Sequence, residues 1–129
     1  IDKIASGGEL ARFLLALKVV LSANEPPKTL IFDEVDSGVG GAVAAAVGAR
    51  LARLGKKMQT LVITHSPQVA SNGDHHLKIE KYQSGEQMLS STVGLSEDER
   101  LEEIARMLAG DEITEAARSA AAQLLKGDR

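Results

Sequence analysis

The sequence contains no cysteine and no tryptophan, and it has few other aromatic residues or prolines. Without cysteine the chain can form neither a disulfide nor a thiolate-ligated metal site, which suits a reducing compartment such as the cytoplasm. With one tyrosine and two phenylalanines, the core is left to leucine, isoleucine, valine and alanine. The apolar runs are far shorter than a membrane span, and no signal-peptide pattern opens the chain. We therefore expect no membrane partner.

Positive charge is also scarce for a nucleic-acid-binding chain. The net charge is −3 over 129 residues, so the sequence offers no broad basic face with which to grip DNA by itself. Its 43% apolar and 26% charged content is ordinary for a globular protein, and its length suffices for one domain. Ile1 stands where a starting methionine would, and a recognisable element follows almost at once, which indicates a segment of a longer protein.

The periodicity of apolar residues in the first half predicts a βαβ unit preceded by a helix. Residues 6–23 repeat apolar side chains at three- and four-residue spacing, as an amphipathic helix does. The short apolar runs 29–34 and 60–65 are typical of strands buried on both faces of a parallel sheet. The helix expected over 42–54 would connect them by a right-handed crossover.

The pattern changes in the second half of the chain. Residues 75–82 and 87–93 alternate polar and apolar side chains around a turn, which predicts an antiparallel hairpin. A capping box, Ser96-x-x-Glu99, opens the next helix, and an alanine-rich helix is expected over roughly 113–126. No internal repeat or interdomain linker is evident, so we expect one α/β lobe.

Two glycines stand at the start of the first expected helix, in the sequence Ser6-Gly7-Gly8-Glu9. A capping box explains Ser6 and Glu9, but it does not explain the glycines, which are poor helix formers. Bare backbone at a helix N-terminus also suits an anion, because unpaired N–H groups and the positive end of the dipole point outward. The stretch is therefore a candidate phosphate site, with a plain helix cap as the alternative.

Polar residues close both expected parallel strands. Asp33 and Glu34 end the first strand, and His65 ends the second. In open α/β sheets the ligand crevice lies outside the carboxyl ends of the strands. A carboxylate there can hold Mg²⁺, and an adjacent one can orient or deprotonate a water molecule. The alternatives are solvated loop acids and a structural histidine.

Other candidate motifs fail on spacing. His75 and His76 are adjacent on an expected strand, so they would point to opposite faces and share a metal poorly. Gly55-Lys56 follows a helix and lacks the remaining positions of a P-loop. The glycine-rich stretch 38–41 lacks the third glycine of a dinucleotide fingerprint.

Taken in order, these pieces resemble the second half of an ABC-type ATPase head. The matching stretches are "ASGGEL" for the signature motif, "TLIFDE" for the Walker B strand, "DSGVGG" for the D-loop and "TH" at 64–65 for the switch histidine. Val35 after the Walker B glutamate and Glu9 at the end of the signature are unlike ABC transporters. They are similar to the SMC-like group of chromosome and DNA-repair ATPases, above all to its bacterial DNA-repair members.

This resemblance implies nucleotide contacts across a dimer. Ser6, Gly7 and Gly8, closed by Glu9, would bind the γ-phosphate of ATP held by the opposite head. The glycines would then leave room for the phosphate. Asp36 would lie at the seam between the two heads.

The same resemblance implies roles within one head. Asp33 would support Mg²⁺ through water, and Glu34 would be the base that polarises the attacking water. His65 would sense the γ-phosphate, and Arg12 would couple the nucleotide to DNA or to the rest of the head. The implied cofactors are ATP and Mg²⁺.

The resemblance covers nearly the whole chain and implies the C-terminal lobe of an ABC/SMC-type P-loop ATPase head over 1–129. The Walker A motif is absent from the sequence; in this family it lies N-terminal, beyond a long coiled coil. The implied partners are that Walker A segment, a second head in a homodimer, and DNA bound by the full-length protein at the nucleoid. The complete protein would tether or join DNA in double-strand-break repair. This chain alone is expected to hydrolyse no ATP.

Two alternatives stay open at this point. One is an ABC-type lobe from another, transporter-like system, against which Val35 counts. The other is a non-catalytic phosphate-binding or dimerisation module, against which Glu34 counts, because a mere binder has little use for a carboxylate that activates water.

Overall fold

The computed structural model describes residues 16, 29–110 and 112–127. The chain divides into two compact units, which meet in sequence between Asn72 and Gly73. The helix expected over 6–23, with the candidate phosphate site at 6–9 and with Arg12, lies outside the described residues apart from Ala16. The prediction of a single lobe over 1–129 stays a prediction.

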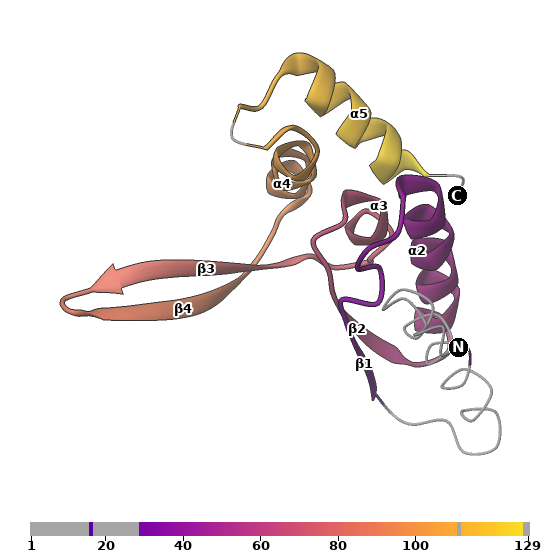
Figure 1. Ribbon diagram of the computed structural model, residues 1–129, viewed down its shortest axis with the longest axis horizontal. Helices are drawn as coiled ribbons and strands as arrows, with labels where there is room; N and C mark the ends of the chain where they lie inside the picture. The colour runs from indigo at the N-terminus through magenta and orange to yellow at the C-terminus, as the bar shows by residue number, and fades with distance from the viewer. Residues whose placement is uncertain (1–15, 17–28, 111, 128–129) are drawn as a thin grey trace, which may run out of the picture. The chain divides into compact units, whose positions relative to one another are not determined.

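The first unit contains the expected βαβ arrangement (Figure 1). Its elements are β1 (Thr29–Asp33), α2 (Gly41–Gly55), β2 (Gln59–Ile63) and the short α3 (Pro67–Ala70). Strands β1 and β2 pair in parallel, from Thr29 opposite Gln59 to Asp33 opposite Ile63. The two strands therefore end at the same level, which confirms the expected placement of their carboxyl ends at one edge.

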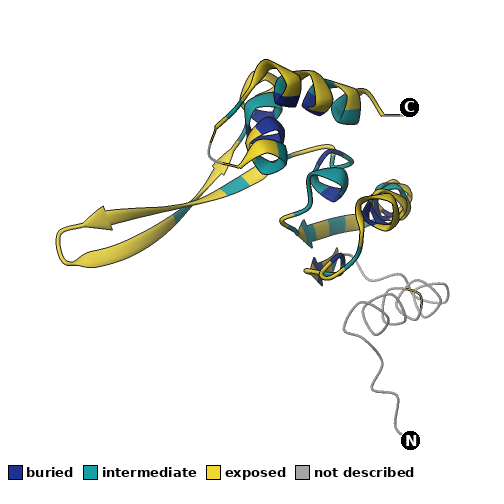
Figure 2. Cartoon of the chain, turned by 45° about the horizontal axis from the view of Figure 1, so that its top comes forward, coloured by how far each residue is buried: buried dark blue, intermediate teal, exposed yellow. Residues whose placement is uncertain are grey.

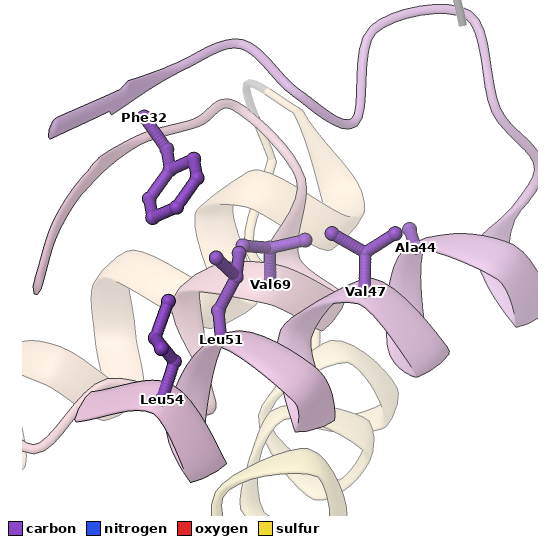
Figure 3. Close-up of a cluster of buried hydrophobic side chains, with 6 residues drawn as sticks. All are labelled: Phe32, Ala44, Val47, Leu51, Leu54 and Val69. Carbon is purple, nitrogen blue, oxygen red and sulfur yellow. The ribbon is translucent and has the colours of Figure 1, made fainter. Parts of the chain in front are cut away.

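The core of this unit lies between the sheet and α2. Figure 3 shows Phe32 of β1 over the apolar face of α2, and Val69 of α3 next to Leu51 and Val47 of that helix. The buried apolar residues are Phe32, Ala44, Val47, Leu51, Leu54 and Val69. Since alternate residues of a strand face opposite sides, the side chains of Leu30 and Val62 lie on the same side as Phe32.

The expectation that these strands are buried on both faces is wrong for the described residues. Ile31, on the outer face of β1, is 55% exposed, and Leu61 and Ile63 of β2 are exposed on the same face. An apolar run indicates that both faces of a strand are hydrophobic, but it does not identify the segments that cover those faces. In the part of the chain that the structure describes, only one face has a packed helix.

The second unit is a hairpin followed by two helices. Its strands are β3 (Leu77–Ser84) and β4 (Gln87–Gly94), which pair antiparallel through a two-residue turn at Gly85 and Glu86. Gly85 has φ 62°, the left-handed conformation that such a turn requires. The hairpin is as predicted, although its first strand begins at Leu77 and not at His75.

Helices α4 (Glu97–Ala109) and α5 (Glu115–Lys126) pack against each other. The predicted capping box is confirmed: the Ser96 hydroxyl accepts from Glu99 N, and the Glu99 carboxylate accepts from Ser96 N at 2.8 Å. Figure 2 shows the buried faces of the two helices, which include Ile104 and Ala121. None of the described helices is long and apolar enough to cross a membrane.

Candidate functional site

The site lies at the edge where β1 and β2 end, in the loops that follow the two strands. Four of the residues predicted from sequence come from these loops or the last strand position: Asp33, Glu34, Asp36 and His65. The parallel register brings them together, because Asp33 is paired with Ile63, two residues before His65. The geometry therefore joins the two strand-end motifs into one site.

Glu34 has an unusual backbone for a residue with a side chain. Its φ is 47°, in the left-handed region, where residues other than glycine and asparagine are uncommon. Two backbone hydrogen bonds hold it there: Glu34 N donates to Ile63 O at 2.9 Å, and Ser37 N donates to Glu34 O at 3.0 Å. Such conformations cost of order 1–3 kcal/mol and cluster at active sites. The carboxylate is left accessible beyond the strand end.

Glu34 and His65 face each other across the edge of the sheet. Glu34 Oε1 lies 4.0 Å from His65 Nδ1, and the two side chains are 59% and 71% exposed. An ion pair this exposed adds little to stability. Both groups therefore remain free to hold a water molecule or a substrate oxygen, as general-base chemistry requires.

Asp36 is buried, unlike the other acids of the site. It is 4% exposed, and its Oδ2 accepts a hydrogen bond from the Thr64 hydroxyl at 2.5 Å. The Thr64 oxygen in turn accepts from Ser66 N at 2.9 Å. The sequence motifs assign no role to Thr64 itself. The only signal was its position before His65, since a contact between two loops is not visible in either stretch alone.

The loop after β2 is held against α3 and α2. Ser66 Oγ donates to Gln68 Oε1 at 3.0 Å, and Asn72 Nδ2 donates to Gln68 O at 2.8 Å. Gly48 of α2 lets these groups approach, because a Cβ there would lie 2.9 Å from Gln68 O. Close packing of two helices thus supports the loop that carries His65.

The acidic groups fit a magnesium ion that also binds a nucleotide. Asp33 and Glu34 are both exposed at the strand ends, and carboxylate oxygens are the ligands that Mg²⁺ prefers. The described residues contain no group of three or more histidine, cysteine or acidic side chains that could hold a metal ion by themselves. Magnesium commonly takes one or two carboxylates together with water and substrate phosphates, which matches this sparse set.

The relatives of the chain include several bacterial proteins described as DNA repair protein RecN. Those of Rickettsia felis, Streptomyces coelicolor and Deinococcus radiodurans are 51%, 48% and 48% identical to it over 125, 129 and 127 residues. The matches cover 97%, 100% and 98% of this chain, but 23%, 23% and 22% of the relatives. The chain therefore spans about a quarter of the length of the curated relatives that it matches. No protein-family model matches it.

Solved structures of SMC heads share the fold. One, from work on ATP-driven dimerization and DNA-stimulated activation of SMC ATPases, has a TM-score of 0.66 at 23% identity, over 83% of this chain and 64% of that one. Another is the Smc head domain of Pyrococcus furiosus with an extended coiled coil, bound to the C-terminal domain of ScpA. Its TM-score is 0.63 at 26% identity, over 78% of this chain and 24% of that one. The predicted fold class, an α/β lobe of an SMC-type head, is confirmed.

Proposed function

Because the chain belongs to the RecN family of DNA repair proteins, we propose that it is part of an SMC-like ATPase that hydrolyses ATP between two dimerised heads. Hydrolysis would drive DNA tethering or joining during double-strand-break repair, in a cytoplasmic protein acting at the nucleoid. The observation that carries the proposal is the accessible pair of Glu34 and His65, 4.0 Å apart at the carboxyl edge of a parallel sheet. A carboxylate so placed suits a water-activating base.

Within one head, each residue of the edge has a chemical task. Glu34 accepts a hydrogen bond from the attacking water and draws its proton away, and His65 donates to the terminal phosphate. Asp33 would help to hold the magnesium ion through water. Mg²⁺ supplies neutralisation of phosphate charge when it is bound. Phosphoryl transfer depends mainly on positioning and charge stabilisation. These three side chains would therefore suffice to position the attacking water and the terminal phosphate, whereas the Walker A segment would hold the rest of the nucleotide.

Across the dimer, Ser6, Gly7 and Gly8 with Glu9 would contact the γ-phosphate of the nucleotide on the opposite head, and the loop of Asp36 would approach the seam. This part of the proposal rests on the resemblance of "ASGGEL" to the ABC signature and on the suitability of a bare helix N-terminus for phosphate. ATP-driven dimerization, described for an SMC ATPase of the same fold, supports the two-headed arrangement. DNA would be bound by the full-length protein, where Arg12 has a coupling role.

The proposal requires a Walker A segment in addition to this chain. Its lysine and hydroxyl residues hold the phosphates and Mg²⁺ in P-loop enzymes, and the sequence has no such motif. We therefore expect no ATP turnover by this chain alone, and turnover when it is combined with the Walker A segment of the same protein.

The test is ATP turnover by the full-length protein with Glu34→Gln, which keeps the size of the side chain but removes the base. We expect a loss of about a hundredfold or more in kcat. Glu86→Gln, at the exposed turn of the hairpin, is the matched control and should leave kcat unchanged. Full turnover with Glu34→Gln would refute the assignment of the base. Nucleotide-dependent dimerisation without turnover in the wild-type protein would favour the non-catalytic dimerisation module.

A further inference from the structure

We propose that Thr64 is a positioning residue, through which the buried carboxylate of Asp36 sets the relative placement of Glu34 and His65. The inference rests on the proposed function, because it concerns the geometry of the same catalytic edge. It adds a residue with no assigned task, and it gives Asp36 a task inside its own head besides the approach of its loop to the seam.

The direction of the hydrogen bonds at Thr64 is determined by its neighbours. The backbone N–H of Ser66 can only donate, and it points at the Thr64 oxygen from 2.9 Å. The single hydroxyl proton of Thr64 is therefore free to be donated to Asp36 Oδ2, at 2.5 Å. A hydroxyl bonded to a carboxylate forms a short, charge-assisted hydrogen bond, which is stronger than one between neutral groups.

Two adjacent hydrogen bonds then hold the loop after β1 against the end of β2 and the loop that follows it. The first is the backbone bond from Glu34 N to Ile63 O, at 2.9 Å. The second is the bond from Thr64 to Asp36. Glu34 takes part in the first bond, and His65 directly follows the donor of the second. A displacement of the loop at Asp36 is consequently transmitted to both catalytic side chains.

The burial of Asp36 indicates that its bond to Thr64 serves more than packing. Its Oδ1 is buried and has no hydrogen-bond partner among the described residues, although a carboxylate oxygen is costly to bury without one. An apolar residue at this position would avoid that cost. One oxygen of Asp36 is bonded to Thr64, and the other can accept from a further donor. The position of this loop can therefore change when a second group binds to the free oxygen.

The experiment compares three variants of the full-length protein. Thr64→Val keeps the shape of the side chain and removes the hydroxyl, whereas Thr64→Ser keeps the hydroxyl. Thr60→Val is the matched control, because Thr60 lies in β2, four residues before Thr64, and the bond that the described residues show for its hydroxyl is to Met58 O, at 3.3 Å. For each we would measure kcat and KM for ATP, the thermal midpoint, and amide exchange over residues 34–41.

We expect Thr64→Val to lower kcat by about tenfold or more, the effect of losing a hydrogen bond to a charged group, with KM changed by less than about twofold. Exchange over 34–41 should accelerate. Thr64→Ser should restore both, and Thr60→Val should match the wild-type protein. A positioning role predicts this separation of kcat from KM and this rescue, whereas a purely structural role predicts parallel losses of activity and thermal midpoint.

Thr64→Val with wild-type kcat would overturn the inference, and so would a loss that Thr64→Ser fails to restore. If Thr64→Val does not fold, Asp36→Asn and Asp36→Leu decide from the acceptor side: Asn retains an oxygen for Thr64, so Asp36→Asn should lose less turnover than Asp36→Leu. Equal losses would overturn the inference. Glu34→Gln, run in parallel, separates the two proposals, since its full turnover would refute the base while the result at Thr64 stands by itself.

Discussion

Glu34 Oε1 lies 4.0 Å from His65 Nδ1, although the two residues follow different strands and a whole helix separates them in sequence. The parallel register accounts for this proximity, because it ends both strands at one level. Both side chains are largely exposed, so the pair is free for chemistry. Backbone conformation and backbone contacts hold the two loops in place, and each of these features can be tested separately.

The left-handed backbone at Glu34 predicts an opposition between stability and activity. Asn adopts positive φ more readily than other residues with side chains, and β-branched residues adopt it least. Glu34→Asn should therefore leave the free energy of unfolding equal or raise it by up to about 1 kcal/mol, while Glu34→Val lowers it by about 1–2 kcal/mol. Urea unfolding followed by circular dichroism would measure both. Equal stability of the two variants would contradict a strained backbone, and both should lose turnover.

Gly48 should tolerate no side chain. A Cβ there would lie 2.8 Å from Asn72 Nδ2, 2.9 Å from Gln68 O and 3.2 Å from the Cα of Val69, and two of these atoms belong to the backbone of α3 and cannot swing away. Gly48→Ala should lower the free energy of unfolding by about 1–3 kcal/mol, despite the better helix propensity of alanine. Gly55→Ala is the control, because a Cβ there meets nothing within 4 Å. A Gly48→Ala protein as stable as that control would show that α3 moves aside.

Glu103 should make the second unit sensitive to acid. Its carboxylate accepts hydrogen bonds from Arg106, as short as 2.6 Å, and pairs with Lys78 at 3.2 Å. The Arg106 bond is the main reason that its pKa lies below the ordinary 4.5, although burial opposes the shift. A carboxyl group whose pKa is lower in the folded than in the unfolded protein stabilises the fold above pH 4.5. This stabilisation is lost as the pH falls through the pKa of the folded state.

The variant Glu103→Gln should therefore lower the free energy of unfolding near neutral pH by about 1–3 kcal/mol. Its difference from the wild type should close as the pH falls below 4.5. Glu112→Gln, at an exposed position of the same unit, controls for the loss of one negative charge. A difference independent of pH would contradict the ionic origin of the effect.

His76 should add a second, milder sensitivity at higher pH. Burial is the main cause that lowers its pKa below 6.5, and the nearby Arg100 and Lys78 lower it further against the opposing Glu103. The unfolded chain takes up this proton more readily, so the free energy of unfolding should decline as the pH falls below 6.5. Removing the imidazole in His76→Gln should flatten that decline. Unfolding midpoints across this range, compared with His75→Gln at the exposed neighbour, test it; identical slopes would contradict it.

Local signals account for the parts of the fold that the sequence predicted well. Apolar runs ending in polar residues located β1 and β2, and the Ser96 capping box located the start of α4, because each signal lies within a few residues. In open α/β sheets the carboxyl ends of parallel strands meet at one edge, and this rule predicted that Glu34 and His65 lie close together. The rule needs only the direction of the strands.

Features that depend on contacts between distant segments were not predictable. The bond from Thr64 to Asp36 joins two loops, and nothing in either loop specifies its partner. Gly48 looks like a weak point of a helix until α3 is packed against it. The exposure of Ile31 was mispredicted for a related reason, since hydrophobicity does not identify the surface that covers a strand.

The alternation of side chains along β1 has one more consequence. Asp33 lies on the outer face with Ile31, at the end of the exposed apolar surface that Leu61 and Ile63 continue on β2. A neighbouring segment that covered this hydrophobic surface would thereby be brought against the carboxylate of Asp33. Covering the outer face and completing the edge at which β1 and β2 end would then be a single assembly event, in which hydrophobic contact supplies the free energy and Asp33 lies at the boundary of the covered surface.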